Sequence, residues 1–169
     1  MKRLFFHAAV FAAGLLVASA AQAKDTDPCP AGLVCASDPS SIEAALRDAG
    51  YLAAVEKDDV GDPMIETVGA DRKFTIFFYD CENGKSCAAL QFRITFAKDE
   101  RHTPDLANKW NARQRFIRFS VLKDQRLELN YDLSTIGGLT KKNFADVVDW
   151  WKVMCRTADK FFSENLGPK

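Results

Sequence analysis

Five cysteines are the residues of this chain whose spacing most directly indicates chemistry. Cys29 and Cys35 are separated by five residues, and so are Cys81 and Cys87. A pair that closes so short a loop forms a disulfide easily in an oxidising compartment, and the chain-entropy model gives about 2.4 kcal/mol for each loop. We therefore predict two disulfides. Cys155 is the odd cysteine, either a buried thiol on an apolar helix face or the partner in an intermolecular bridge.

The residues needed for metal, cofactor or redox chemistry are largely missing. Zinc ligands usually come in pairs two to four residues apart, and a thioredoxin-like centre needs Cys-x-x-Cys, so neither fits these cysteines. The chain has no Gly-x-Ser-x-Gly motif and no glycine-rich phosphate loop. We therefore expect no cofactor and no metal.

His102 is the residue on which any catalytic hypothesis depends, because it is the one histidine beyond the first 23 residues. It directly precedes Thr103, where a surface or helix-capping role is the simpler interpretation. The alternative is a small hydrolase of the cell envelope in which His102 and a nearby acid activate Cys155 or a serine. Replacing His102 by Ala distinguishes the two hypotheses.

The first 23 residues predict a cleaved export signal. Lys2 and Arg3 precede an apolar run of 15 residues, 4–18, and Ala21–Ala23 has the small-x-small pattern of a cleavage site. The run is shorter than the roughly 20 residues that a membrane-spanning helix needs. Cleavage leaves 21 basic residues against 23 acidic ones, a net charge of −2. We expect a periplasmic or secreted protein with no stable membrane span and no affinity for nucleic acid.

The chain without its signal has the length of one domain, and its patterns predict helices mixed with strands. Residues 24–39 are rich in Asp, Pro and Cys, so we expect an irregular segment held by the Cys29–Cys35 disulfide. Ser40, followed three residues later by Glu43, has the pattern of a capping box and begins a helix that ends at Gly50.

Two further helices are indicated by their caps. Thr103 precedes a proline and an acidic residue, and Thr140 precedes an apolar stripe that keeps helical spacing from Phe144 to Phe162. The element order is helix, four strands, helix, two strands, helix. It predicts an α+β fold over residues 40–169, with an antiparallel sheet of about five to six strands and helices packed on one face.

The register of two hairpins follows from the cysteines and from apolar alternation. If Cys81 faces Cys87, then Phe78 faces Leu90, and one face of the hairpin is wholly apolar. A shift by one residue would destroy both features. In the second hairpin the predicted pairs are Val121 with Leu127, Phe119 with Leu129 and Ile117 with Tyr131.

Two groups of side chains are candidates for an interface. Residues 109–118 interleave basic with aromatic side chains, which suits an acidic peptide, an anionic lipid head group or peptidoglycan carboxylates. The simpler explanation is that cations favour the C-terminal end of a helix. The second group is aromatic and lies outside the predicted core faces. The candidate residues are Phe77, Tyr79, Arg93, Trp110, Arg113, Arg115, Arg118 and Trp150.

These elements carry a resemblance to a known family. Four segments in this order resemble the YbjN domain family of bacterial sensory transduction regulators, with coverage from about residue 41 to residue 162. The resemblance implies a fold similar to type III secretion chaperones, which bind protein segments as dimers and have no catalytic centre, so no catalytic residue is transferred. The segments are Phe78–Cys81, Cys87–Phe92, Trp110–Phe116 and Gly137–Thr140.

The residues and the resemblance together favour a binding module over an enzyme. We expect an exported, non-catalytic module that recognises another protein or peptide of the cell envelope, in envelope sensing or stress signalling, with a homodimer as one assembly to test. The alternative remains the small hydrolase that relies on His102.

Overall fold

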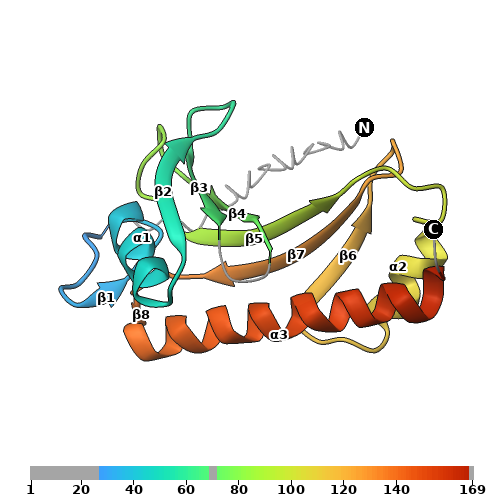
Figure 1. The fold of residues 1–169 in the computed structure, drawn as a ribbon. Helices are drawn as coiled ribbons and strands as arrows, with labels where there is room; N and C mark the ends of the chain where they lie inside the picture. Colours follow the sequence, from blue (N-terminus) through green and yellow to red (C-terminus); the bar gives the residue numbers. More distant parts are fainter. Residues whose placement is uncertain (1–26, 69–71, 168–169) are drawn as a thin grey trace, which may run out of the picture.

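The computed structural model describes residues 27–68 and 72–167, so the predicted export signal lies outside the described residues. The chain has an α+β fold of helices and antiparallel strands in the predicted order, with two additional short strands, β1 and β8 (Figure 1). The elements are β1 (Leu33–Val34), α1 (Pro39–Asp48), β2 (Leu52–Lys57), β3 (Pro63–Val68), β4 (Phe74–Tyr79), β5 (Ala89–Phe96), α2 (Pro104–Asn111), β6 (Ile117–Val121), β7 (Leu127–Ser134), β8 (Leu139–Thr140) and α3 (Lys141–Leu166).

Six of the strands form one antiparallel sheet in the order β2-β3-β4-β5-β7-β6. Both predicted hairpin registers are confirmed: Phe78 pairs with Leu90, and the β6–β7 pairs are the three predicted ones. The Cys81–Cys87 disulfide closes the β4–β5 connection with an S–S distance of 2.12 Å. Strand alternation then places six large apolar side chains of the central hairpin on one face, Phe74, Ile76, Phe78, Leu90, Phe92 and Ile94.

Helices cover that apolar face, and α3 runs along it across several strands (Figure 1). Trp151 of α3 is 1% exposed and packs between the rings of Phe74 and Phe92, with centroids 5.5 Å and 5.6 Å away. Helix α1 lies beside β2 and helix α2 beside β6. The sheet and the three helices of the described ranges therefore share one core, while the other sheet face carries no helix.

The helix starts follow ordinary capping chemistry. Thr103 accepts a hydrogen bond from the Leu106 N–H and Thr140 accepts one from the Asn143 N–H, as predicted. The first helix differs from the prediction, because its cap is Asp38, whose carboxylate accepts from the Ser40 N–H. Pro39 then occupies the first helical position, which needs no N–H donor, so the helix begins before Ser40.

The N-terminal segment is also more regular than predicted. It is held by the expected disulfide between Cys29 and Cys35, with an S–S distance of 2.07 Å. Beyond that, β1 pairs with β8 as a second, two-stranded sheet, and the Ala36 N–H donates to Thr135 Oγ1 at 2.8 Å. These contacts join residues about a hundred positions apart in the chain, a distance over which local patterns carry no signal.

The two edges of the six-stranded sheet differ. At β6, the Asn111 side chain bonds both backbone groups of Phe119, and Trp110 Nε1 donates to the Ile117 carbonyl. Helix α2 thus occupies the outer side of that edge. At β2 the Arg47 side chain donates to the Ala53 carbonyl, and Leu52 is 75% exposed.

None of the helices within residues 27–68 and 72–167 is long and apolar enough to span a membrane.

Candidate functional site

The uncovered sheet face brings three of the predicted interface residues together. The guanidinium of Arg93 lies 4.3 Å from the centroid of the Phe77 ring, and its Nη2 donates to the Tyr79 hydroxyl at 2.7 Å. Arg93 Nε donates to Gln91 Oε1 at 2.9 Å, and Arg93 Nη1 lies 3.8 Å from Glu128 Oε1. Phe77 is therefore covered by a cation, and this part of the face is more polar than the two aromatic residues alone imply.

The same network continues across β7 to β6. Gln91 Nε2 donates to Asp132 Oδ1 at 2.6 Å, and Arg118 forms an ion pair with the same carboxylate. Arg118, another predicted interface residue, therefore belongs to the same network as Arg93, although its strand β6 is at the edge of the sheet. The face is a polar platform whose charges already compensate one another, so it offers little net charge to a ligand.

A second surface is more apolar and more exposed. Phe116 is 64% exposed and Trp150 is 42% exposed, with ring centroids 6.3 Å apart. The guanidinium of Arg115 lies 5.5 Å from the Phe116 ring centroid. We refer to Arg115, Phe116 and Trp150 as the Phe116–Trp150 patch. Arg113 is exposed on the same α2–β6 loop.

The backbone of Phe116 explains why this patch exists. Its φ is 68°, a left-handed conformation that costs a bulky residue about 1 to 3 kcal/mol. Strand alternation would place Phe116 on the same side as Arg118, on the uncovered face. The positive φ instead turns its ring toward Trp150 and Tyr131, on the helix side of the sheet. The sequence predicted Trp150 and the basic loop separately, and the structure joins them.

The prediction that Trp110 lies at an interface is wrong. Trp110 has no exposed surface, because its ring packs against Phe119 at 4.6 Å and against Phe161 at 5.3 Å. Its indole N–H donates to the Ile117 carbonyl. Trp110 therefore belongs to the core and to the covered edge of β6, and the basic residues around it do not share a surface with it.

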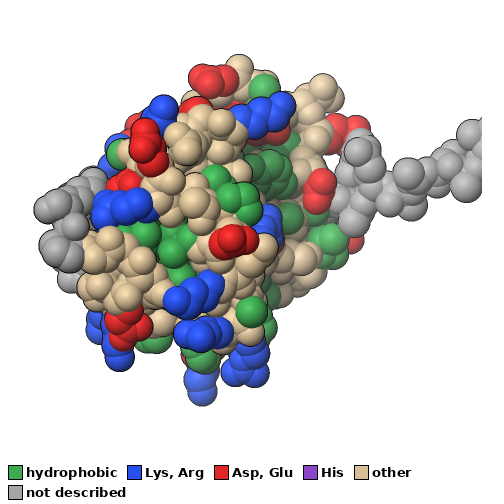
Figure 2. All heavy atoms as spheres, turned by 90° about the vertical axis from the view of Figure 1, so that its right-hand side faces the viewer, with side chains coloured by type: hydrophobic (Ala, Val, Ile, Leu, Met, Phe, Trp, Pro, Cys, Tyr) green, Lys and Arg blue, Asp and Glu red, His purple; other side chains and the backbone are tan. Residues whose placement is uncertain are grey.

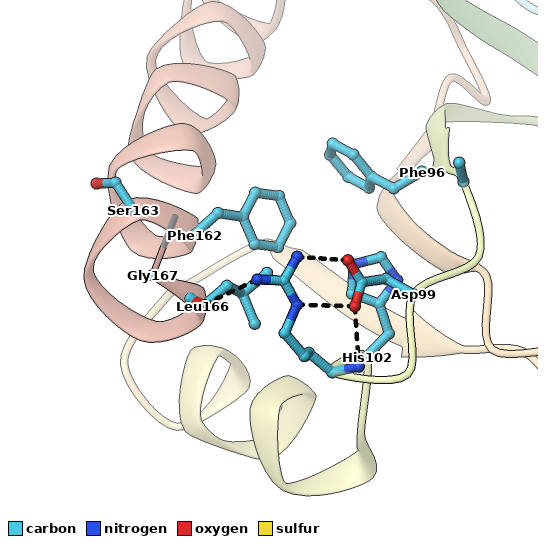
Figure 3. A pocket seen from close by; sticks show the side chains of 9 residues that line it. Phe96, Asp99, His102, Phe162, Ser163, Leu166 and Gly167 are labelled. Atoms are coloured by element: carbon cyan, nitrogen blue, oxygen red, sulfur yellow. Dashed lines mark hydrogen bonds and ion pairs between the residues drawn. The ribbon is translucent and has the colours of Figure 1, made fainter. Parts of the chain in front are cut away.

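His102 is also placed differently from the expectation of a surface residue. It is 6% exposed, and its Nδ1 lies 3.2 Å from the carbonyl of Gln125 in the β6–β7 turn. Ser163 lines the cavity of Figure 3 together with His102, but its hydroxyl donates to the Lys160 carbonyl at 2.7 Å and points away from His102. His102 and Ser163 are therefore not arranged as a base and its nucleophile.

The ion pair of Asp99 with Arg101 lies beside His102 and holds the C-terminal end of α3. Arg101 Nε and Nη2 donate to the two oxygens of Asp99 at 2.8 Å and 2.6 Å, and its Nη1 donates to the Leu166 carbonyl at 2.9 Å (Figure 3). The side-chain hydrogen bonds from Arg101 lower the pKa of Asp99 well below its ordinary range, and the Arg101 backbone N–H adds to this. The sequence contains the local pair but no sign of its contact with α3.

The Asp99–Arg101 ion pair should make the unaltered protein lose stability in acid faster than the variant Asp99→Asn. We expect the melting temperature of the protein to fall more steeply between about pH 5 and pH 2 than that of Asp99→Asn. The folded-state pKa of Asp99 lies below the unfolded value of about 3.9, so its contribution is complete above that value and is lost as the pH falls toward the folded pKa. Circular dichroism melts at stepped pH measure the two slopes.

Asp59→Asn is the control, because Asp59 lies exposed in the β2–β3 turn. Its slope should match that of the unaltered protein. Equal slopes for the unaltered protein and Asp99→Asn would contradict the role of the Asp99–Arg101 pair.

A scan against protein-family models matches residues 38–164 to YbjN, described as "Putative bacterial sensory transduction regulator". The chain belongs to the YbjN family. A search of curated proteins found no match. The YbjN match begins at Asp38, the cap of α1, and ends within the last turns of α3, so it contains both the uncovered sheet face and the Phe116–Trp150 patch. Strand β1 and the Cys29–Cys35 disulfide precede it.

The YbjN description points to regulation rather than catalysis. Regulation requires contact with another molecule, so the exposed surfaces of the YbjN domain are the places to look for function.

Proposed function

We propose that this chain is a non-catalytic regulatory module of the cell envelope that recognises a segment of another protein at the Phe116–Trp150 patch. The observation that carries the proposal is Phe116, a large apolar side chain held 64% exposed in a left-handed backbone conformation. Strain of this kind persists where the surrounding structure maintains it, and it concentrates at functional positions.

The composition of the patch fits protein recognition. Tryptophan and arginine are among the residues that contribute most to binding energy at protein interfaces. Arg115 flanks the two aromatic rings, and Arg113 lies exposed on the same loop. Figure 2 views the end of the molecule that carries α2 and the C-terminus, where Lys and Arg side chains gather at the lower margin. Arg115 beside the Phe116 ring and Arg113 on the same loop suit an acidic segment with apolar side chains.

The envelope location is supported by two features of the chain. The first 23 residues have the pattern of an export signal. Both cysteine pairs are at disulfide distance in the structure, and such bonds persist in oxidising compartments such as the periplasm.

Replacing Trp150 tests the patch. Trp150→Ser should reduce capture of the partner from envelope extracts by roughly tenfold, because it removes an aromatic anchor, while the melting temperature changes by no more than about 2 °C. Val60→Ser is the matched control, since Val60 is 81% exposed in the β2–β3 turn, outside the patch. Quantitative mass spectrometry of the captured proteins gives the ratio.

Sedimentation velocity of the same variants separates the partner from a second copy of the chain. A loss of self-association on Trp150→Ser would assign the patch to a homodimer. Equal capture and equal association for Trp150→Ser and Val60→Ser would reject the patch as an interface.

A further inference from the structure

A cavity of about 300 Å³ lies between the end of β5, the segment 97–103 and the last turns of α3 (Figure 3). Its apolar wall consists of Phe96, Phe162 and Leu166, and the two rings meet edge to face with centroids 4.9 Å apart. A volume of this size is at the lower end of those that hold small organic ligands. The wall favours a compact apolar or aromatic body.

The opposite wall is polar and carries unused hydrogen-bond donors. The guanidinium of Arg101 has five N–H groups, of which one each on Nε, Nη2 and Nη1 bonds to Asp99 or to the Leu166 carbonyl. The bond from Nη2 uses the edge shared with Nε, so its second N–H lies on the terminal edge of the guanidinium. Arg101 can therefore donate to an acceptor in the cavity without giving up its present partners.

The charge of Arg101 is already balanced. Both oxygens of Asp99 lie within 2.8 Å of the guanidinium, so an incoming carboxylate would meet a negative charge at the same place. An uncharged acceptor such as a hydroxyl or a carbonyl oxygen gains the hydrogen bond without that repulsion. A cationic ligand would lose its hydration without gaining an unbalanced carboxylate, because both oxygens of Asp99 already bond to Arg101.

The walls are held in place before any ligand arrives. Segment 97–103 is joined to α3 through Arg101 and Leu166, and to the β6–β7 turn through His102 and the Gln125 carbonyl. It is also fixed at its end by Thr103, the cap of α2. A cavity with fixed walls binds with a smaller loss of conformational entropy than a loop that must first become ordered.

We propose that this cavity binds a small uncharged amphiphile, with an apolar or aromatic body packed against the Phe96–Phe162 pair and a hydroxyl or carbonyl oxygen that accepts a hydrogen bond from Arg101. The site is separate from the Phe116–Trp150 patch and would give the regulator a small-molecule input in addition to its protein partner.

Benzyl alcohol is the probe, and benzoate and benzylamine are its charged counterparts. In ¹⁵N–¹H correlation spectra of the protein, we expect benzyl alcohol to cause saturable shifts with a Kd of about 1 mM, as for other fragments of this size. The affected amides should belong to the cavity residues. Both charged probes should bind at least about fivefold more weakly, which corresponds to roughly 1 kcal/mol.

Ala97→Leu adds bulk at the cavity lining and should weaken benzyl alcohol binding at least about fivefold. Ala112→Leu is the control, because Ala112 is an exposed alanine at the end of α2 and does not line the cavity. In the unaltered protein, nuclear Overhauser effects between the probe ring and the Phe96 and Phe162 rings locate the ligand without any substitution. Absence of these effects, tighter binding of benzoate, or unchanged binding by Ala97→Leu would each overturn the proposal.

Discussion

Trp151→Ala should lower the free energy of unfolding by about 3 to 5 kcal/mol, the usual result of removing a large buried ring. The Trp151 side chain is 1% exposed and joins α3 to the two central strands through Phe74 and Phe92. Truncation leaves a cavity that the rigid sheet cannot fill. Urea denaturation followed by circular dichroism measures the change from the shift of the midpoint at constant m-value.

The adjacent Trp150 provides the matched control. It has the same side chain on the same helix but is 42% exposed, so Trp150→Ala should cost less than about 1 kcal/mol. Trp151→Ala and Trp150→Ala remove the same side chain, so a difference between their free energies of unfolding comes from how deeply each ring is packed. Similar losses would mean that Trp150 is part of the core and that the Phe116–Trp150 patch is not an independent surface.

Trp110→Ala should have an effect of similar size, about 3 to 5 kcal/mol, for two reasons. The ring fills the space between Phe119 and Phe161, and its Nε1 satisfies the Ile117 carbonyl at 3.0 Å. Trp110→Phe separates these contributions, because it retains most of the apolar contact but leaves a buried carbonyl unpaired. We expect about 1 to 3 kcal/mol for that loss.

Asn108→Ala, on the exposed side of α2, should change the free energy of unfolding by less than about 0.5 kcal/mol. If Trp110→Phe were as stable as the unaltered protein, the indole hydrogen bond would have no role in covering the edge of β6. Denaturation curves for all three variants decide between these results.

The features that the sequence predicted correctly are those with short periods or short loops. Alternation along β4 and β5, together with the Cys81–Cys87 disulfide, allows one register only, because a shift by one residue would expose the apolar face. Thr103 and Thr140 are correct for the same reason, since a cap and the N–H groups it satisfies lie within four residues.

The remaining features depend on contacts that no local pattern records. The hydrogen bond from Trp110 to the Ile117 carbonyl required knowing that α2 packs on β6, and the exposure of Phe116 depends on one backbone torsion that breaks strand alternation. The Arg101 contact with Leu166 joins residues 65 positions apart. The candidate cavity and the patch therefore became visible only with the tertiary structure.

The unequal edges of the sheet limit how copies of this chain could associate strand by strand. Helix α2 and its side chains occupy the hydrogen-bonding side of β6, so of the two edges of the six-stranded sheet, as far as the described residues form it, β2 is the one at which an added strand could pair. An edge that can pair only with its own counterpart gives a two-fold contact, which uses both β2 edges and leaves none for a third copy. Association by this route would end at a closed pair and would not extend into a fibre.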